Sequence, residues 1–166
     1  MLSAVPTLVS AEGFYAGGSI GFGEAEYSAS DEFFFAEGDD TVAGVKAVGG
    51  YRINNFLAVE ANLVGAANDE DDSFDEIEFA AISASAIFLV PISEKFDLLF
   101  RGGYFVGESE VSVFDSEDES GFVVGGGGQV SFGSRKQFSI RMEYEYYDTD
   151  ELQELWLLTG GFYYNF

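Results

Sequence analysis

The chain has 166 residues, of which 30 are acidic, 7 are basic and none is histidine or cysteine, and its formal net charge is −23. This length suits one domain. The absence of cysteine excludes disulfide frameworks and thiolate metal sites, and the absence of histidine excludes Ser-His-Asp and zinc-hydrolase catalysis. So negative a charge argues against nucleic acid as a partner. No apolar run reaches the roughly 18 residues of a transmembrane helix, so a bilayer protein of this composition has to be a β-barrel.

The first eleven residues, MLSAVPTLVSA, end in the small-residue spacing of a signal-peptidase site, Val9-Ser10-Ala11. A complete signal peptide would also carry a basic start, which this stretch does not have. We interpret residues 1–11 as the remnant of a signal peptide, which implies export; the alternative is an ordinary flexible N-terminus. Residues 12–166 are predicted to form one domain.

Eight segments with alternating apolar and polar residues follow in chain order. Their approximate ranges are 14–22, 42–53, 56–65, 77–90, 96–106, 121–132, 137–146 and 155–166. Alternation with period two places the two sets of residues on opposite faces of a strand. The pattern is clearest in the seventh segment, where Phe138, Ile140, Met142, Tyr144 and Tyr146 alternate with Gln137, Ser139, Arg141, Glu143 and Glu145. We therefore predict eight β-strands.

The connections between these segments alternate in length. Those after the second, fourth and sixth segments are short. The others are longer and contain no basic residue, and together with Glu78 at the start of the fourth segment they hold 24 of the 30 acidic residues. Aromatic residues recur near both ends of the segments. On tilted strands the two sets lie about 20–25 Å apart, which is the height of the apolar band of a transmembrane barrel. A soluble β-sandwich is the alternative, but nothing in that fold requires two belts of aromatic residues at this separation. The pattern predicts an all-β, eight-stranded antiparallel up-and-down transmembrane barrel, with both termini periplasmic.

Four stretches carry a family resemblance: GFYAGGSIGF at 13–22, GGYRINNFLAVEA at 49–61, FSIRMEYEYYD at 138–148 and the final GGFYYNF. In this order and spacing, the chain resembles the OmpA-like eight-stranded outer-membrane barrels. The resemblance implies a monomeric barrel in the outer-membrane bilayer of a Gram-negative bacterium, with no cofactor. Some members of the family carry a peptidoglycan-binding domain after the barrel; because this sequence stops at Phe166, we expect none here. It also implies that Phe162, Tyr164 and Phe166 form the signal for the barrel-assembly machinery, and that Glu60 is the family's lumen glutamate.

Several charged residues fall on the polar faces of the predicted strands, and therefore inside the barrel. The lumen cluster predicted from this pattern consists of Lys46, Arg52, Glu60, Arg101, Arg141, Glu143 and Glu145, with Asp97 as a further inward acid. An eight-stranded barrel is only wide enough for its own side chains, and an unpaired buried charge is costly, so these groups should pair. The cluster is either an ion path or gate, or a structural plug. We favour the plug because so many large groups share so little space.

The densest acidic run lies in the second long connection and contains Asp69, Glu70, Asp71, Asp72 and Asp75. Carboxylates are natural Ca²⁺ ligands, but this run is not an EF-hand because Ser73 occupies the position that requires glycine. We expect at most weak, diffuse binding of divalent cations. The alternative, which we favour, is a solvated acidic surface.

Three functions remain open at this stage. The first is a non-enzymatic outer-membrane barrel that displays four acidic extracellular loops for envelope integrity or surface interaction. The second is a small, porin-like channel for ions or solutes. The third, an outer-membrane enzyme, ranks last because the small enzymes of this kind use a histidine, and the chain has none.

Overall fold

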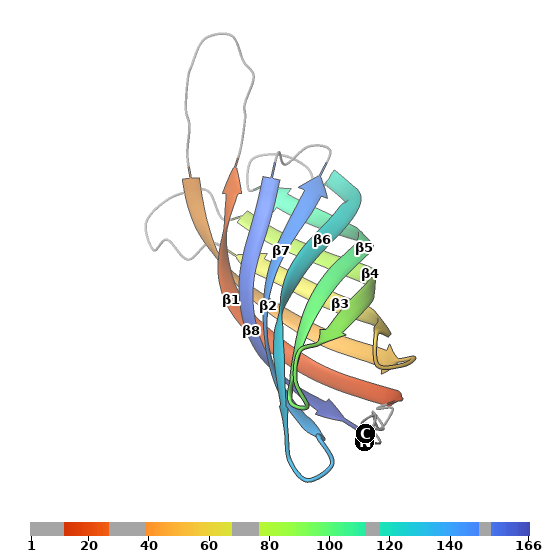
Figure 1. Cartoon of the computed structure of the whole chain (residues 1–166). Coiled ribbons are helices and arrows are strands. Elements are labelled where there is room, and N and C mark those ends of the chain that lie inside the picture. The colour runs from red at the N-terminus through yellow and green to blue at the C-terminus, as the bar shows by residue number, and fades with distance from the viewer. Residues whose placement is uncertain (1–11, 27–38, 68–76, 112–116, 150–153) are drawn as a thin grey trace, which may run out of the picture.

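The computed structural model describes residues 12–26, 39–67, 77–111, 117–149 and 154–166. These residues form eight strands: β1 (Gly13–Glu26), β2 (Asp39–Arg52), β3 (Leu57–Ala67), β4 (Ile77–Pro91), β5 (Phe96–Val111), β6 (Glu117–Phe132), β7 (Phe138–Thr149) and β8 (Glu154–Asn165). Each strand pairs antiparallel with the next, and β8 pairs with β1, so the sheet closes into a barrel (Figure 1). The predicted fold class is confirmed. No helix in the described ranges is long and apolar enough to cross a membrane.

The strands extend further away from the short turns than the sequence pattern predicts. β5 runs to Val111 and β6 starts at Glu117, so acidic residues such as Glu108 and Asp118, expected in a loop, pair within the sheet. Backbone hydrogen bonding continues beyond the apolar band because the backbone groups still need partners there. The change from apolar to acidic side chains therefore marks the end of the apolar band, not the end of the strand.

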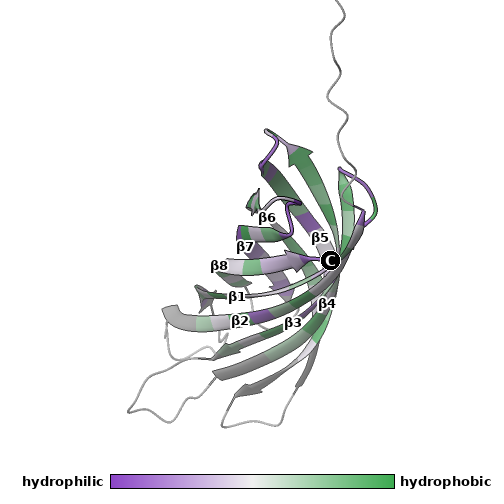
Figure 2. Ribbon diagram, turned by 90° about the horizontal axis from the view of Figure 1, so that it is seen from below, coloured by the Kyte–Doolittle hydropathy of each residue, from purple (hydrophilic) through white to green (hydrophobic). Residues whose placement is uncertain are grey.

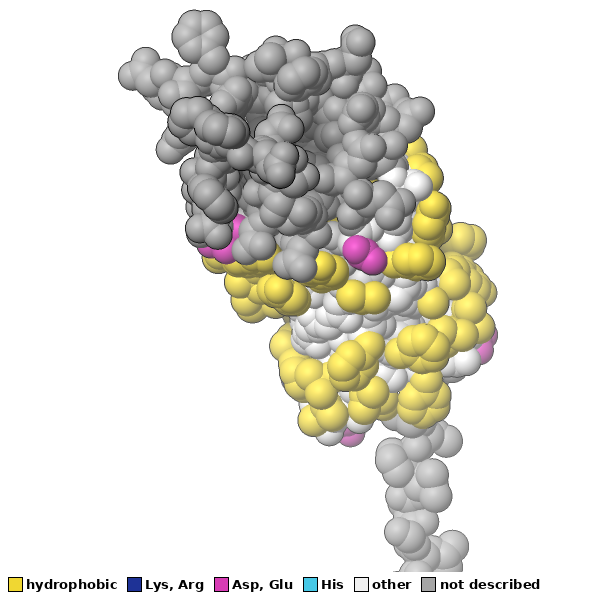
Figure 3. Space-filling view, turned by 90° about the horizontal axis from the view of Figure 1, so that it is seen from above, with side chains coloured by type: hydrophobic (Ala, Val, Ile, Leu, Met, Phe, Trp, Pro, Cys, Tyr) yellow, Lys and Arg dark blue, Asp and Glu magenta, His cyan; other side chains and the backbone are white. Residues whose placement is uncertain are grey.

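The two faces of each strand differ as the alternation predicts. On β7, Ile140 is 53% exposed on the outside, whereas its neighbour Arg141 is 3% exposed on the inside. Figure 2, seen from below, shows hydrophilic residues interleaved with hydrophobic ones along the strands and present in the short turns. Hydrophobic side chains cover much of the visible flank in Figure 3. An apolar outer band of this kind is the surface that a bilayer requires.

The three short turns use local side-chain acceptors to satisfy backbone amides. After β2, Asn54 Oδ1 accepts hydrogen bonds from the Phe56 and Leu57 amides at 2.8 and 2.9 Å. After β4, Ser93 Oγ accepts from the Phe96 amide at 3.1 Å. These are the Asx- and Ser-type turns that such residues favour. The C-terminal end of β8 lies at the same end of the barrel as these turns (Figure 1).

Inward-facing glycines on β6 make room for the charged residues of β7. Gly125 and Gly127 pair in register with Glu145 and Glu143. A Cβ atom at either glycine would overlap the backbone of β7, whereas a Cβ at the outward Gly160 would meet nothing within 4 Å. The inner glycines therefore allow the carboxylates into a narrow lumen, and any larger residue there would crowd them.

Candidate functional site: the closed lumen

The centre of the lumen holds three carboxylates and three cations from four strands. Lys46 comes from β2, Glu60 from β3 and Arg101 from β5, and β7 supplies Arg141, Glu143 and Glu145. Each of these residues is only 1% to 4% exposed. The formal charges of the six groups cancel. We refer to these six residues as the central cluster.

Glu60 accepts hydrogen bonds from three sides. Arg101 Nη2 lies 2.5 Å from Glu60 Oε2, and Arg141 Nη1 lies 2.5 Å from Oε1. The Tyr15 hydroxyl donates to Glu60 Oε1 at 2.6 Å. Because the donors come from β1, β5 and β7, Glu60 joins opposite walls of the barrel through charge-assisted bonds.

Glu143 and Glu145 share their cations. Lys46 Nζ lies 2.9 Å from one carboxylate oxygen of each. Arg101 contacts both as well: its Nη2 lies 2.8 Å from Glu143 Oε1, and its Nε lies 2.7 Å from Glu145 Oε1. Together with its bond to Glu60, Arg101 therefore contacts all three carboxylates of the central cluster.

Arg141 is held in place by groups other than carboxylates too. Its Nε donates to Gln129 Oε1 at 3.0 Å. Its guanidinium carbon lies 4.2 Å from the ring centroid of Tyr163 and 5.6 Å from that of Tyr15, distances at which cation–π attraction contributes. Sequence reasoning missed these three partners, although their alternating positions on β1, β6 and β8 place them on the inward faces.

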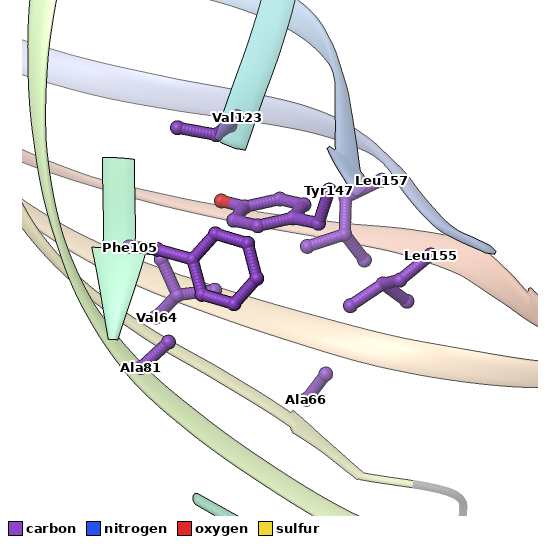
Figure 4. Packing of buried hydrophobic residues seen from close by; sticks show 8 residues of the cluster. All are labelled: Val64, Ala66, Ala81, Phe105, Val123, Tyr147, Leu155 and Leu157. Atoms are coloured by element: carbon purple, nitrogen blue, oxygen red, sulfur yellow. The ribbon is translucent and has the colours of Figure 1, made fainter. Parts of the chain in front are cut away.

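Two apolar layers enclose the central cluster. Towards the short turns lie Tyr15, Val48, Ala58, Ile87, Leu89, Leu99 and Tyr163. Towards the other end lie Val64, Ala66, Ala81, Phe105, Val123, Tyr147, Leu155 and Leu157 (Figure 4). The order of inward residues along β5, from Leu99 through Arg101 to Phe105, encodes this layering within a single strand. The charges are thus separated from both ends of the barrel.

Arg52 does not join the central cluster. It is the last residue of β2, and its Nη2 lies 3.2 Å from Oδ2 of Asp97, the second residue of β5. The side chains are 15% and 14% exposed. Sequence periodicity placed Arg52 correctly on the inward face, but its height along the strand puts it beyond the apolar layer, at the short-turn end.

The fold of the chain matches known outer-membrane barrels. The model of the outer membrane protein β-barrel domain matches residues 1–166. The chain belongs to this family. Comparison with curated protein sequences returned no match.

Solved structures support the same conclusion about the fold. The barrel is similar to Neisserial surface protein A (TM-score 0.70, 18% identity, covering 92% of this chain and 97% of that one). It also resembles Ail of Yersinia pestis (TM-score 0.60, 21% identity, covering 92% of this chain and 99% of that one). A third similar structure is the N-terminal barrel domain of Pseudomonas aeruginosa OprF (TM-score 0.57, 14% identity, covering 91% of this chain and 97% of that one). The protein is therefore a transmembrane β-barrel of the Gram-negative outer membrane.

In this outer-membrane barrel, the residues predicted to form the assembly signal lie on the outer surface. Phe162 and Tyr164 point outward from β8, and Phe166 is 80% exposed. The predicted cation run, Asp69, Glu70, Asp71, Asp72 and Asp75, and the signal-peptide remnant at 1–11 lie outside the described residues. Within the described ranges, no group of three or more acidic residues is arranged to hold a metal ion.

Proposed function

We propose that the protein is a non-conducting, non-enzymatic outer-membrane barrel that acts through its outer surface, either in envelope integrity or in contacts with other molecules. The observation that carries this proposal is the closed lumen. The central cluster is neutral, each of its carboxylates has at least two cationic partners, and an apolar layer lies on either side of it.

This arrangement opposes conduction at two levels. An ion that enters the lumen has to lose its hydration next to side chains such as Leu99 or Phe105, which offer no replacement ligands. It then has to separate buried charge pairs, and breaking one such pair is strongly unfavourable. The alternative function, a small ion or solute channel, is favoured only by the presence of charged groups inside the barrel.

The proposed orientation places the short turns and both termini in the periplasm and the long connections outside. Short periplasmic and longer outer connections are the usual arrangement in such barrels. The acidic residues of the long connections would then face the medium. There they keep the outer surface hydrated and repel anionic molecules, with at most diffuse binding of divalent cations.

Conductance across a planar bilayer tests the proposal. The refolded protein should give no steady conductance, while a porin added to the same bilayer gives clear steps. Insertion is checked separately by the resistance of the barrel to protease in vesicles. An absence of conductance then cannot be explained by failed insertion. Regular ion-conducting steps from the inserted wild-type protein would show that the lumen opens and would establish the channel.

Two further measurements address the outer surface. A surface-labelling reagent that cannot cross the outer membrane should modify a cysteine introduced at Asp71 in intact cells, but not one introduced at Ser134 in a short turn. Calorimetric titration with Ca²⁺ at moderate salt should give weak heats without saturation. A saturable site of micromolar affinity would instead identify a specific cation site.

A further inference from the structure

The turn between β6 and β7, residues 133–136, presents two adjacent cations. Arg135 and Lys136 are both exposed, and neither forms an ion pair with any residue that the structure describes. Of the other five basic residues, three belong to the central cluster and Arg52 pairs with Asp97. Lys95 also forms no ion pair with a described residue, but it stands alone in its turn and next to the acidic Glu94 in sequence. In a chain of net charge −23, this turn is therefore a local concentration of free positive charge.

The backbone of this turn is fixed, and in a conformation unusual for lysine. Lys136 has φ +56°, in the left-handed region that glycine or asparagine adopts more easily. The Asn165 side-chain amide donates to the Lys136 carbonyl at 3.0 Å, and the Lys136 amide donates to the Gly133 carbonyl at 3.2 Å. A lysine at a position that suits glycine better is a backbone outlier, and such an outlier motivates a functional hypothesis for its side chain.

Four aromatic rings lie beside the turn on the outer surface. Phe132, the last residue of β6, and Phe138, the first residue of β7, stack with their ring centroids 5.8 Å apart. Phe162 and Tyr164 of β8 extend the group, at 5.7 and 5.4 Å from Phe138. All four rings are exposed or half-exposed on the outward face. The two cations thus border an apolar platform at one rim of the barrel.

We propose that this rim binds an anionic phospholipid. The phosphate group of the lipid lies against Arg135 and Lys136, and its acyl chains lie along the four rings. Charge complementarity favours an anionic headgroup over a zwitterionic one, and the rings lie beside the part of the acyl chains that is nearest to the headgroup. Binding itself does not depend on which leaflet the rim occupies; the proposed orientation places it in the periplasmic leaflet.

Quenching of tryptophan fluorescence by brominated lipids tests this at each rim separately. The only tryptophan of the chain, Trp156, reports the opposite rim. A Phe138→Trp/Trp156→Phe variant reports the basic rim. The vesicles contain phosphatidylcholine and phosphatidylglycerol, and only one of the two lipids is brominated in each experiment. The extent of quenching then gives the binding constant of phosphatidylglycerol relative to phosphatidylcholine next to each tryptophan. A cation near an anionic surface contributes roughly a fivefold preference, so phosphatidylglycerol should be preferred on the order of twentyfold at position 138 at low salt, and not at Trp156.

Charge-removing variants localise the effect. Arg135→Gln/Lys136→Gly in the Phe138→Trp/Trp156→Phe background should abolish the preference while the barrel still folds, because glycine suits the backbone at position 136. Lys95→Gln, which removes a cation from the neighbouring turn, should leave most of the preference for phosphatidylglycerol at position 138. A preference below twofold at position 138 would overturn the proposal, as would an equal preference at both rims. If Lys95→Gln reduced the preference as much as Arg135→Gln/Lys136→Gly does, the lipid would be attracted by the general positive charge of this end of the barrel and not by a site at residues 135 and 136. None of these outcomes depends on whether the lumen conducts.

Discussion

Replacing Glu60 by Gln tests the central cluster most directly. The substitution keeps the shape of the side chain and an oxygen that accepts from Tyr15, but it removes the charge that Arg101 and Arg141 share at 2.5 Å each. Arg101 retains Glu143 and Glu145, whereas the remaining carboxylate contact of Arg141 is a distant one, 3.9 Å from Glu143. The lumen then holds one uncompensated buried cation. Breaking a buried pair from one side costs about 3–5 kcal/mol.

A second substitution separates charge balance from lost packing. In Glu60→Gln/Arg141→Gln, the central cluster is neutral again, so the double variant should be more stable than the sum of the two single variants predicts. The expected coupling energy is about 2–3 kcal/mol, at the upper end of the range for residues in direct contact. Asp97→Asn is the matched control: it removes a carboxylate from the more exposed Arg52–Asp97 pair and should cost at most about 1 kcal/mol.

Reversible urea unfolding in lipid vesicles measures these differences. The single tryptophan, Trp156, gives the fluorescence signal, and the slower migration of the unfolded form in electrophoresis provides a second observable. Two-state analysis then gives the free energy of unfolding for each variant. If Glu60→Gln costs no more than Asp97→Asn, or if the effects at Glu60 and Arg141 simply add, the charges in the lumen are not mutually dependent and the plug model fails.

Three further predictions concern other parts of the barrel. Ile140→Arg, on the lipid face, should cost about 2–4 kcal/mol if the residue lies near the bilayer centre, and a lipid-phase quencher should reach a fluorescent label at position 140 but not at 141. Gly127→Ala should destabilise the barrel by about 1–3 kcal/mol through overpacking, while Gly160→Ala should change the unfolding free energy little; equal effects would contradict the inward crowding. Phe166→Ala should slow assembly in cells without slowing refolding into vesicles, and equal rates in cells would remove its role as a signal.

The fold could be predicted from sequence because each strand carries its own signal. Alternation places a residue such as Ile140 or Arg141 on a definite face without any knowledge of the neighbouring strands. Strand ends were less predictable. The acidic residues near Glu108 and Asp118 resemble a loop in composition, yet they continue the ladder, because the hydrogen bonding of a hairpin does not depend on side-chain polarity.

The lumen was predictable in its membership but not in its contacts. Periodicity shows that Lys46, Glu60 and Arg101 point inward, but their pairing depends on the stagger between strands around the whole barrel. For the same reason sequence could not show that Arg52 lies at a different height from the others. Tyr15 was missed because attention to formal charge overlooks neutral donors, although a phenol is a natural partner for a buried carboxylate.

The central cluster also constrains the order in which the barrel enters the membrane. Its ion pairs join residues far apart in the chain: Lys46 is 97 and 99 positions from its two glutamate partners, and Glu60 is 81 positions from Arg141. The first six strands alone carry Lys46, Glu60 and Arg101, with one excess positive charge, and only β7 supplies the compensating negative one. An open sheet that lacks β7 would bring unbalanced charge into hydrocarbon. We therefore expect insertion and closure to be coupled, because the last hairpin supplies the negative charge that balances the lumen.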